Sequence, residues 1–325
     1  MQSFCPEYYN SFKCIANRCP DSCCQGWDVV VDELSEAYYS SVDSEFGDKI
    51  RRVTVTDDDG DRIFTLKNGR CPFWNKDELC DIYINLGEDR LCKTCKKFPR
   101  ITMEFEDFTE YTLSLACPEA ARIILSSDFT IPDGDYRLDC PEKDIEFMEF
   151  LLRAREETFK IFLDNKVSFK NRLKNAFRFN REIQNELSPV SDDKTSDCSD
   201  LRFIFDIHSR LEFINSKYSE DIKDAADFQL SSKFDGVFTR MSLYYIYRYY
   251  LNAFDSSDVL AVLKRILCAY VICASLAEMK PDKNIIRIIQ NYSKEVEHSY
   301  ENNEVLEFFF ENDERFSVNN IIDSI

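Results

Sequence analysis

The chain has 325 residues, and 44% of them are hydrophobic, so it has material for two ordinary domains with buried cores. Its 60 acidic and 41 basic residues give a net charge of -19, which repels phosphate backbones and argues against nucleic acid as a partner. A cationic partner is electrostatically permitted, but many proteins carry such a charge for solubility alone.

Short elements are expected in the first half of the chain, because its apolar patterns are brief and broken by polar turns. In chain order we predict a helix within residues 1–13, a strand at Val29 and Val31, a helix from Asp32 or Ser35 to about Phe46, a hairpin over 53–66, a strand over 105–115, and a helix opening at Cys117. An acidic turn ending in Gly60 indicates the hairpin, and Pro118 suits the first turn of the last helix.

Apolar residues recur at helical spacing from about residue 143, where glycine almost disappears. This pattern predicts helices over 143–164, 167–187, 201–216, 233–254, 257–279, 282–299 and 301–311, with a polar loop or linker over 188–200. We therefore predict an α+β cysteine-rich metal-binding domain over residues 1–142, followed by an all-α domain over residues 143–325. The protein should be predominantly helical.

Cysteine is concentrated at the start of the chain, where eleven of the fourteen thiols lie within the first 140 residues. Residues 1–20 carry several charges and no continuous apolar core, so they do not resemble a secretory signal. The longest apolar run, residues 266–277, is too short to span a bilayer. We therefore expect a cytoplasmic protein without a membrane partner, in which clustered thiols stay reduced and bind metal.

The metal ligands in the first half should be thiolates, because both histidines, His208 and His298, fall in the helical half. Thiolates select zinc or iron–sulfur clusters, and the spacing leaves these two alternatives open. The basic segment 90–100 surrounds the CxxC pair formed by Cys92 and Cys95. Its positive charges would lower thiolate pKa values or hold an anionic carboxylate, although a merely solvated basic face is an equal alternative.

The cysteine motifs follow one another in the order C-x4-C-x3-C-C-x-G-W, then C-P-F, C-D-I-Y-I-N-L-G, C-x2-C-x2-F-P-R and S-L-x-C-P-E-A-A-R. This order resembles the flagellin lysine-N-methylase family. The matching residues are Cys14, Cys19, Cys23, Cys24, Gly26, Trp27, Cys71, Pro72, Cys80, Asp81, Tyr83, Cys92, Cys95, Phe98, Pro99, Arg100, Cys117, Pro118, Glu119 and Arg122. The resemblance implies transfer of a methyl group from S-adenosylmethionine to lysine side chains of flagellin, with a bound [4Fe-4S] cluster.

The predicted metal ligands fall into two tiers, Cys19, Cys23, Cys24, Cys71, Cys80 and Cys95, and then Cys14, Cys92 and Cys117. The five remaining cysteines are predicted to be non-ligands, and two of them to be buried in an apolar helix: Cys5, Cys140, Cys198, Cys268 and Cys273. Candidates for the general base are Asp28, Asp81 and Tyr83. Candidates for cofactor binding are Trp27, Arg100 and Arg122, the last also expected to pair with Glu119 one helical turn away.

Two other functions fit the same residues. In the first, the protein is not an enzyme, the cluster or zinc ion only stabilises the fold, and the helical half binds a protein partner. In the second, the metal centre serves as a redox or metal sensor. Saturable binding of S-adenosylmethionine and a cleft open to a lysine side chain distinguish the enzyme from the first of these, and reversible loss of the cluster would mark the second.

Overall fold

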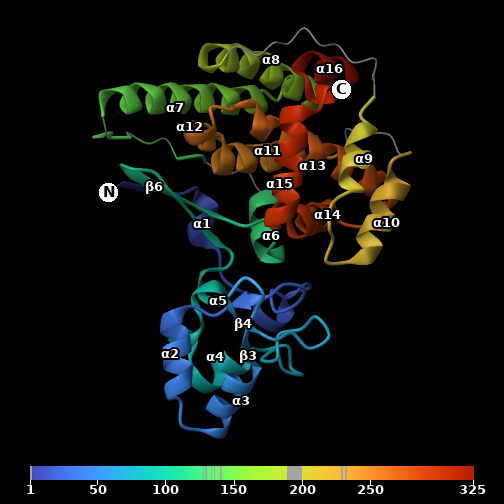
Figure 1. The fold of residues 1–325 in the computed structure, drawn as a ribbon. Helices are drawn as coiled ribbons and strands as arrows, with labels where there is room; N and C mark the ends of the chain where they lie inside the picture. Colours follow the sequence, from blue (N-terminus) through green and yellow to red (C-terminus); the bar gives the residue numbers. More distant parts are fainter. Residues whose placement is uncertain are drawn as a thin grey trace.

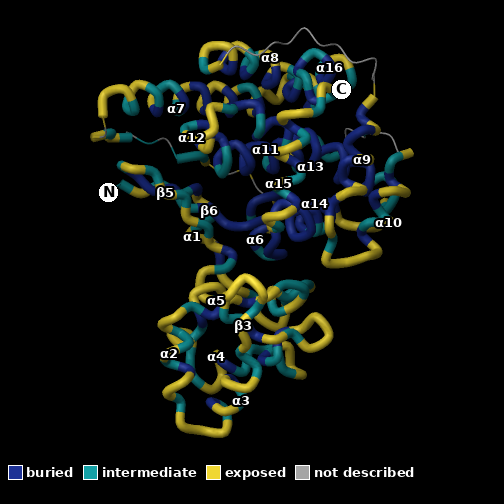
Figure 2. The backbone as a smooth tube through the Cα atoms, in the orientation of Figure 1, coloured by how far each residue is buried: buried dark blue, intermediate teal, exposed yellow. Residues whose placement is uncertain are grey.

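Two separate hydrophobic cores set the architecture. The structure is a computed structural model and describes residues 2–126, 128, 130–132, 134, 136–139, 141–188, 200–227, 230 and 233–325. The smaller core lies within residues 24–95, here called the small lobe, and the larger core contains the buried residues of the rest of the chain, here called the helical part. Figure 1 shows the small lobe on one side of the helical part, and Figure 2 shows buried residues concentrated in the helical part.

The small lobe consists of short elements around a three-stranded antiparallel sheet of order β2-β4-β3. Asp32 caps the first helix by accepting a hydrogen bond from the Ser35 amide, as expected from the sequence. The elements are β2 (Val29–Val30), α2 (Glu33–Ser41), α3 (Glu45–Val53), β3 (Thr54–Thr56), β4 (Arg62–Phe64), α4 (Asp81–Leu86) and α5 (Lys93–Lys97).

A second three-stranded sheet belongs to the helical part rather than to the small lobe. Its order is β1-β6-β5, with β1 (Gln2–Phe4) parallel to β6 (Phe108–Leu113) and β5 (Arg100–Glu104) antiparallel to β6. Helices α1 (Glu7–Ser11) and α6 (Pro118–Ser126) both contact the same large core. The β6 residue Glu110 is fully buried and forms a two-point ion pair with Arg155 of the helical half, at 2.7 and 2.8 Å.

The remaining elements are helices, and many of them pack around α13 (Leu260–Met279). They are α7 (Glu142–Leu163), α8 (Phe169–Leu187), α9 (Phe203–His208), α10 (Ser216–Ala225), α11 (Asp235–Tyr249), α12 (Ala253–Ser256), α13 (Leu260–Met279), α14 (Ile285–Tyr292), the π-helical turn η4 (Ser293–Glu297), α15 (Tyr300–Asn312) and α16 (Val318–Ser324). Helix α13 is long and apolar enough to cross a membrane by length and composition. However, 83% of its apolar window is buried inside the protein, so its apolar side chains are covered by neighbouring helices.

The predicted predominance of helix is confirmed, as are the hairpin over 53–66 and most of the later helices. Several details were wrong. The helix after Asp32 ends at Ser41 and a second one starts at Glu45, because the Ser44 side chain caps a new helix through the Gly47 amide. The helix predicted within residues 1–13 is present as α1, but the strand β1 before it was missed, since β1 pairs with a distant segment that the local pattern does not reveal.

In the helical half, the helix predicted over 201–216 ends at His208, and the separate helices α10 and α16 were missed. The predicted loop over 188–200 lies largely outside the described residues. The predicted domain boundary at residue 142 stays a prediction.

Candidate metal centre and its junction with the helices

The nine cysteines predicted as ligands lie near one another, in two neighbouring groups. Within each group, the charge of one ionised thiol raises the pKa of another. The two groups are also close to each other, because the charge of Cys23 in one group raises the pKa of Cys95 in the other. The core group, inside the small lobe, is Cys24, Cys71, Cys80, Cys92 and Cys95. The junction group, toward the helical part, is Cys14, Cys19, Cys23 and Cys117.

Backbone amides point at four of these sulfurs. Cys71, Cys80, Cys92 and Cys117 each accept a hydrogen bond from an amide two or three residues further along the chain. Three of them stand directly before a helix, namely α4, α5 and α6, where free amides are available. Amide hydrogen bonds favour the charged thiolate, which is the form that binds metal.

Burial opposes ionisation at most of these thiols. It raises the pKa of Cys71 to about 12 and that of Cys117 to about 11. Cys24 and Cys92 are exceptions. The hydrogen bond from the adjacent Cys23 thiol lowers the pKa of Cys24 to about 7, and the hydrogen bond from Cys95 lowers the pKa of Cys92. A bound cation would supply the charge that lets the buried thiols ionise.

The donor set suits a thiolate-selective metal in its chemistry, with nine thiols and amide donors aimed at four of them. The side chains are not arranged as a closed ligand shell. Within the part of the chain that the structure describes, no three His, Cys, Asp or Glu side chains are placed to hold one metal ion. Holding a metal therefore requires the thiols to close onto it, and the ligand set stays a prediction.

The cysteines predicted to be non-ligands lie elsewhere. Cys268 and Cys273 are fully buried in α13, which confirms their expected burial. Cys5 lies half-buried beside Asn10, whose amide donates to its sulfur at 3.7 Å. Cys140 and Cys198 lie outside the described residues.

Among the candidates for the general base, Asp81 lies beside the Cys80 thiol, whose pKa its charge raises. Asp81 forms an ion pair with Lys49 at 3.0 Å and accepts a hydrogen bond from Asn75 at 2.9 Å, so its carboxylate is held by local contacts. Tyr83 is 51% exposed on α4, and Asp28 is exposed beside β2. Their catalytic assignment stays a prediction.

Two of the three cofactor-binding candidates are also tied to local partners. Arg122 makes the expected ion pair with Glu119, with contacts of 2.7 and 2.8 Å along α6. The Arg100 guanidinium lies 5.3 Å from the ring centre of Phe12. The third candidate, Trp27, lies at the contact between the small lobe and the helical part.

The segment from Asp21 to Trp27 docks on the end of α14 and on η4. Asp21 forms an ion pair with Lys294 at 2.9 Å and accepts a hydrogen bond from Gln290 at 3.1 Å. The Lys294 ammonium lies 5.1 Å from the Trp27 ring centre, a cation–π distance. We call this contact, between residues 21–27 and residues 290–298, the junction; Figure 1 shows α6 and α14 on the side of the helical part that is nearest to α5 and β4.

The η4 side of the junction was missed at the sequence level. Two signals in the sequence pointed to it: His298 is one of only two histidines, and the run YYIYRYY over 244–250 is unusually rich in tyrosine. The structure places three of these tyrosines and Arg248 around Glu297, the residue before His298. Helical periodicity alone predicts that such residues are buried in a core, because it does not reveal which side chains of different helices contact one another.

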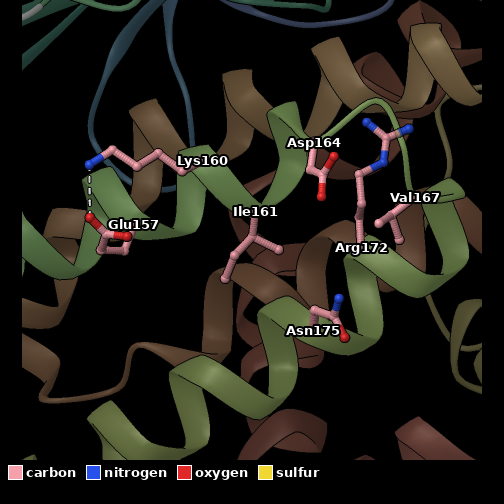
Figure 3. A pocket seen from close by; sticks show the side chains of 7 residues that line it. All are labelled: Glu157, Lys160, Ile161, Asp164, Val167, Arg172 and Asn175. Atoms are coloured by element: carbon pink, nitrogen blue, oxygen red, sulfur yellow. Dashed lines mark hydrogen bonds and ion pairs between the residues drawn. The ribbon is translucent and has the colours of Figure 1, made fainter.

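A groove of about 270 Å³ lies far from the thiols, between α7 and α8 (Figure 3). It is lined by Glu157, Lys160, Ile161, Asp164, Val167, Arg172 and Asn175. Lys160 is paired with Glu157 at 2.8 Å, and none of the predicted site residues lines the groove. We assign no function to it.

Comparison with known proteins identifies relatives of this chain. It is 30% identical over 145 residues to the flagellar biosynthetic protein FliU of Salmonella muenchen, covering 40% of this chain and 80% of FliU. It is 31% identical over 136 residues to the lysine-N-methylases of Salmonella typhimurium and Salmonella choleraesuis, covering 37% of this chain and 32% of each methylase. No family model matches the chain, and no solved structure matches it. On the strength of these relatives, the chain belongs to the flagellin lysine-N-methylase family.

Proposed function

We propose that this protein is a cytoplasmic protein-lysine N-methyltransferase that uses S-adenosylmethionine and acts on flagellin. The single observation that carries the proposal is membership of the family, whose relatives are named for lysine methylation and flagellar biosynthesis. The net charge of -19 supports it, because an acidic surface attracts a lysine-bearing protein segment.

We further propose that the core and junction groups of thiols hold a [4Fe-4S] cluster, with zinc as the alternative. A bound cluster would supply positive charge and, at an iron with an open position, a place for the amino and carboxylate groups of S-adenosylmethionine. One such cluster needs at most four thiolates, and only three when one iron is left open, so some of the nine thiols would be structural or would serve a second metal. The amide donors at Cys71, Cys80, Cys92 and Cys117 support a thiolate-bound metal of either kind.

One observation favours the non-enzymatic alternative. Cys71 and Cys92 are buried within the smaller hydrophobic core, where a metal would stabilise a lobe that has few other buried residues. In that case the metal would be structural and the helical half would bind a protein partner.

The deciding experiment begins with anaerobic purification, followed by iron, sulfide and zinc analysis and a transfer assay with labelled S-adenosylmethionine and flagellin. Equal iron and sulfide with label on flagellin lysines is the expected result. Zinc without transfer would favour the structural protein.

A matched pair of variants tests the thiols. Cys71→Ser should lose metal and lower the melting temperature, whereas Cys5→Ser, outside both thiol groups, should keep wild-type metal content. Full metal content in Cys71→Ser would contradict its assignment as a ligand.

A further inference from the structure

The π-helical turn η4 presents a histidine beside the thiol-bearing segments. π-Helical turns are rare and are frequent at functional sites. This one follows α14, contains Lys294 and Glu297, and is followed at once by His298. It contacts residues 21–27 through the ion pair between Lys294 and Asp21.

Two aromatic rings from the cysteine motifs hold the imidazole of His298. Its ring centre lies 5.2 Å from that of Trp27 and 5.8 Å from that of Phe98, and these two rings are 5.6 Å apart. Trp27 follows the Cys23-Cys24 pair, and Phe98 follows the CxxC pair. His298 is nevertheless exposed at the surface. Among the described residues, neither of its ring nitrogens has a hydrogen-bond partner.

The neighbouring carboxylate is fully engaged and serves as an anchor. Glu297 is 5% exposed and accepts hydrogen bonds from Tyr244 at 3.0 Å and Tyr249 at 2.9 Å, besides Ser293 and its ion pair with Arg248. These donors come from α11 and from η4 itself. They fix the end of η4, and with it the backbone from which His298 projects.

We propose that His298 is the group that removes the proton from the substrate lysine, an inference that rests on the proposed methyltransferase function. The lysine ammonium transfers one proton to a free ring nitrogen of His298. The neutral amine then attacks the methyl carbon of the sulfonium donor, so that a carbon–nitrogen bond forms and a carbon–sulfur bond breaks. The electron pair of the broken bond leaves on sulfur, and the imidazolium returns its proton to water.

The surroundings of His298 favour its neutral, proton-accepting form. Packing against Trp27 and Phe98 removes part of the solvent around the ring. This partial loss of solvent and the positive charge of Arg248 lower the pKa of His298 below the ordinary value, and Glu297 opposes them. The other charged groups at the junction, Lys294 and Asp21, neutralise each other as an ion pair. The second histidine of the chain is unsuitable, because His208 is fully buried and both its ring nitrogens have partners, the Ile204 carbonyl and the Tyr292 hydroxyl.

The first test is the pH dependence of methyl transfer in the metal-loaded full chain. His298→Gln should lower kcat about 10²- to 10⁴-fold at neutral pH, with KM for S-adenosylmethionine unchanged. In the wild type the rate should rise with pH and level off above the His298 pKa. In the variant it should keep rising toward the pKa of lysine itself, about 10.4. Added imidazole should restore part of the lost rate.

The second test observes the histidine directly. The two histidines give two imidazole NMR signals, and His298→Asn assigns them by removing one. A flagellin peptide carrying the target lysine should lower the His298 pKa relative to the same peptide with norleucine, because an ammonium beside the ring disfavours a second positive charge.

These outcomes separate this inference from the proposed function. If the wild type methylates flagellin while a folded His298→Gln keeps the same kcat and pH profile, the inference is overturned and the function stands. If the wild type transfers no methyl group and the lysine and norleucine peptides act alike on His298, both are overturned.

Discussion

Gly26 occupies a backbone position that other residues fill only with strain. Its φ is +97°, in the region where a side chain is disfavoured, and it stands between the adjacent thiols and Trp27. A Cβ there would lie 2.9 Å from the Ile214 side chain, a distance that forces the contact apart. The glycine is therefore required both for the turn and for the close approach of the small lobe to the helical part.

Gly26→Ala should destabilise the junction more than the same change at a matched glycine. Gly60 has a similar φ of +91°, but a Cβ there would meet nothing within 4 Å. The backbone strain, about 1–3 kcal/mol, is common to both variants, so the difference in their free energies of unfolding measures the Ile214 contact. Denaturant unfolding of both variants checks this. Equal losses of unfolding free energy in the two variants would show that the close approach to Ile214 contributes nothing to stability.

At the scale of elements, a buried ion pair ties the β1-β6-β5 sheet to α7. Glu110 of β6 and Arg155 of α7 are both almost completely buried, and the Tyr136 hydroxyl bridges them through hydrogen bonds to each. A buried pair of this kind contributes little net stability against an apolar replacement, but removing one partner leaves an uncompensated charge. The sheet and the helix are thus placed relative to each other with high specificity.

Glu110→Gln should lower the free energy of unfolding by about 3–5 kcal/mol, because it leaves the Arg155 charge buried without its counterion. The matched control is Glu149→Gln on α7, the helix that carries Arg155, where the partner Arg153 is exposed and the change should be near zero. Thermal unfolding of the two variants measures the contrast. A small loss at Glu110 would mean that water or a neighbouring group compensates Arg155.

At the scale of the whole molecule, the two hydrophobic cores differ greatly in the number of apolar side chains they bury. The larger core includes β6, α6 and α13, whereas the smaller one contains few apolar side chains and several of the predicted thiol ligands. A small core is marginal without a metal or another cross-link. The helical part should therefore be stable by itself, while the small lobe should depend on its metal.

Removing metal from the loaded protein with a chelator should loosen the small lobe selectively. Amides of α4 and β4 should exchange hydrogen faster, while those of α13 should stay protected, since that helix lies inside the larger core. Hydrogen exchange measured with and without the chelator reports the protection of both sets of amides. Equal loss of protection in α13 would show that the two cores unfold together.

The sequence by itself determined the long helices, the hairpin, the helix cap at Asp32, the helix start at Pro118, and the family, because each depends on a local pattern of residues or on the spacing of cysteines. It did not reveal that β1 pairs with β6, or that residues 98–125 pack with the helices, since both depend on contacts between distant segments. The junction could not be predicted from the sequence for the same reason. Lys294, Glu297 and His298 read as part of one amphipathic helix, and only the tertiary structure brings them to Asp21, Trp27 and Phe98, more than a hundred residues away in the chain.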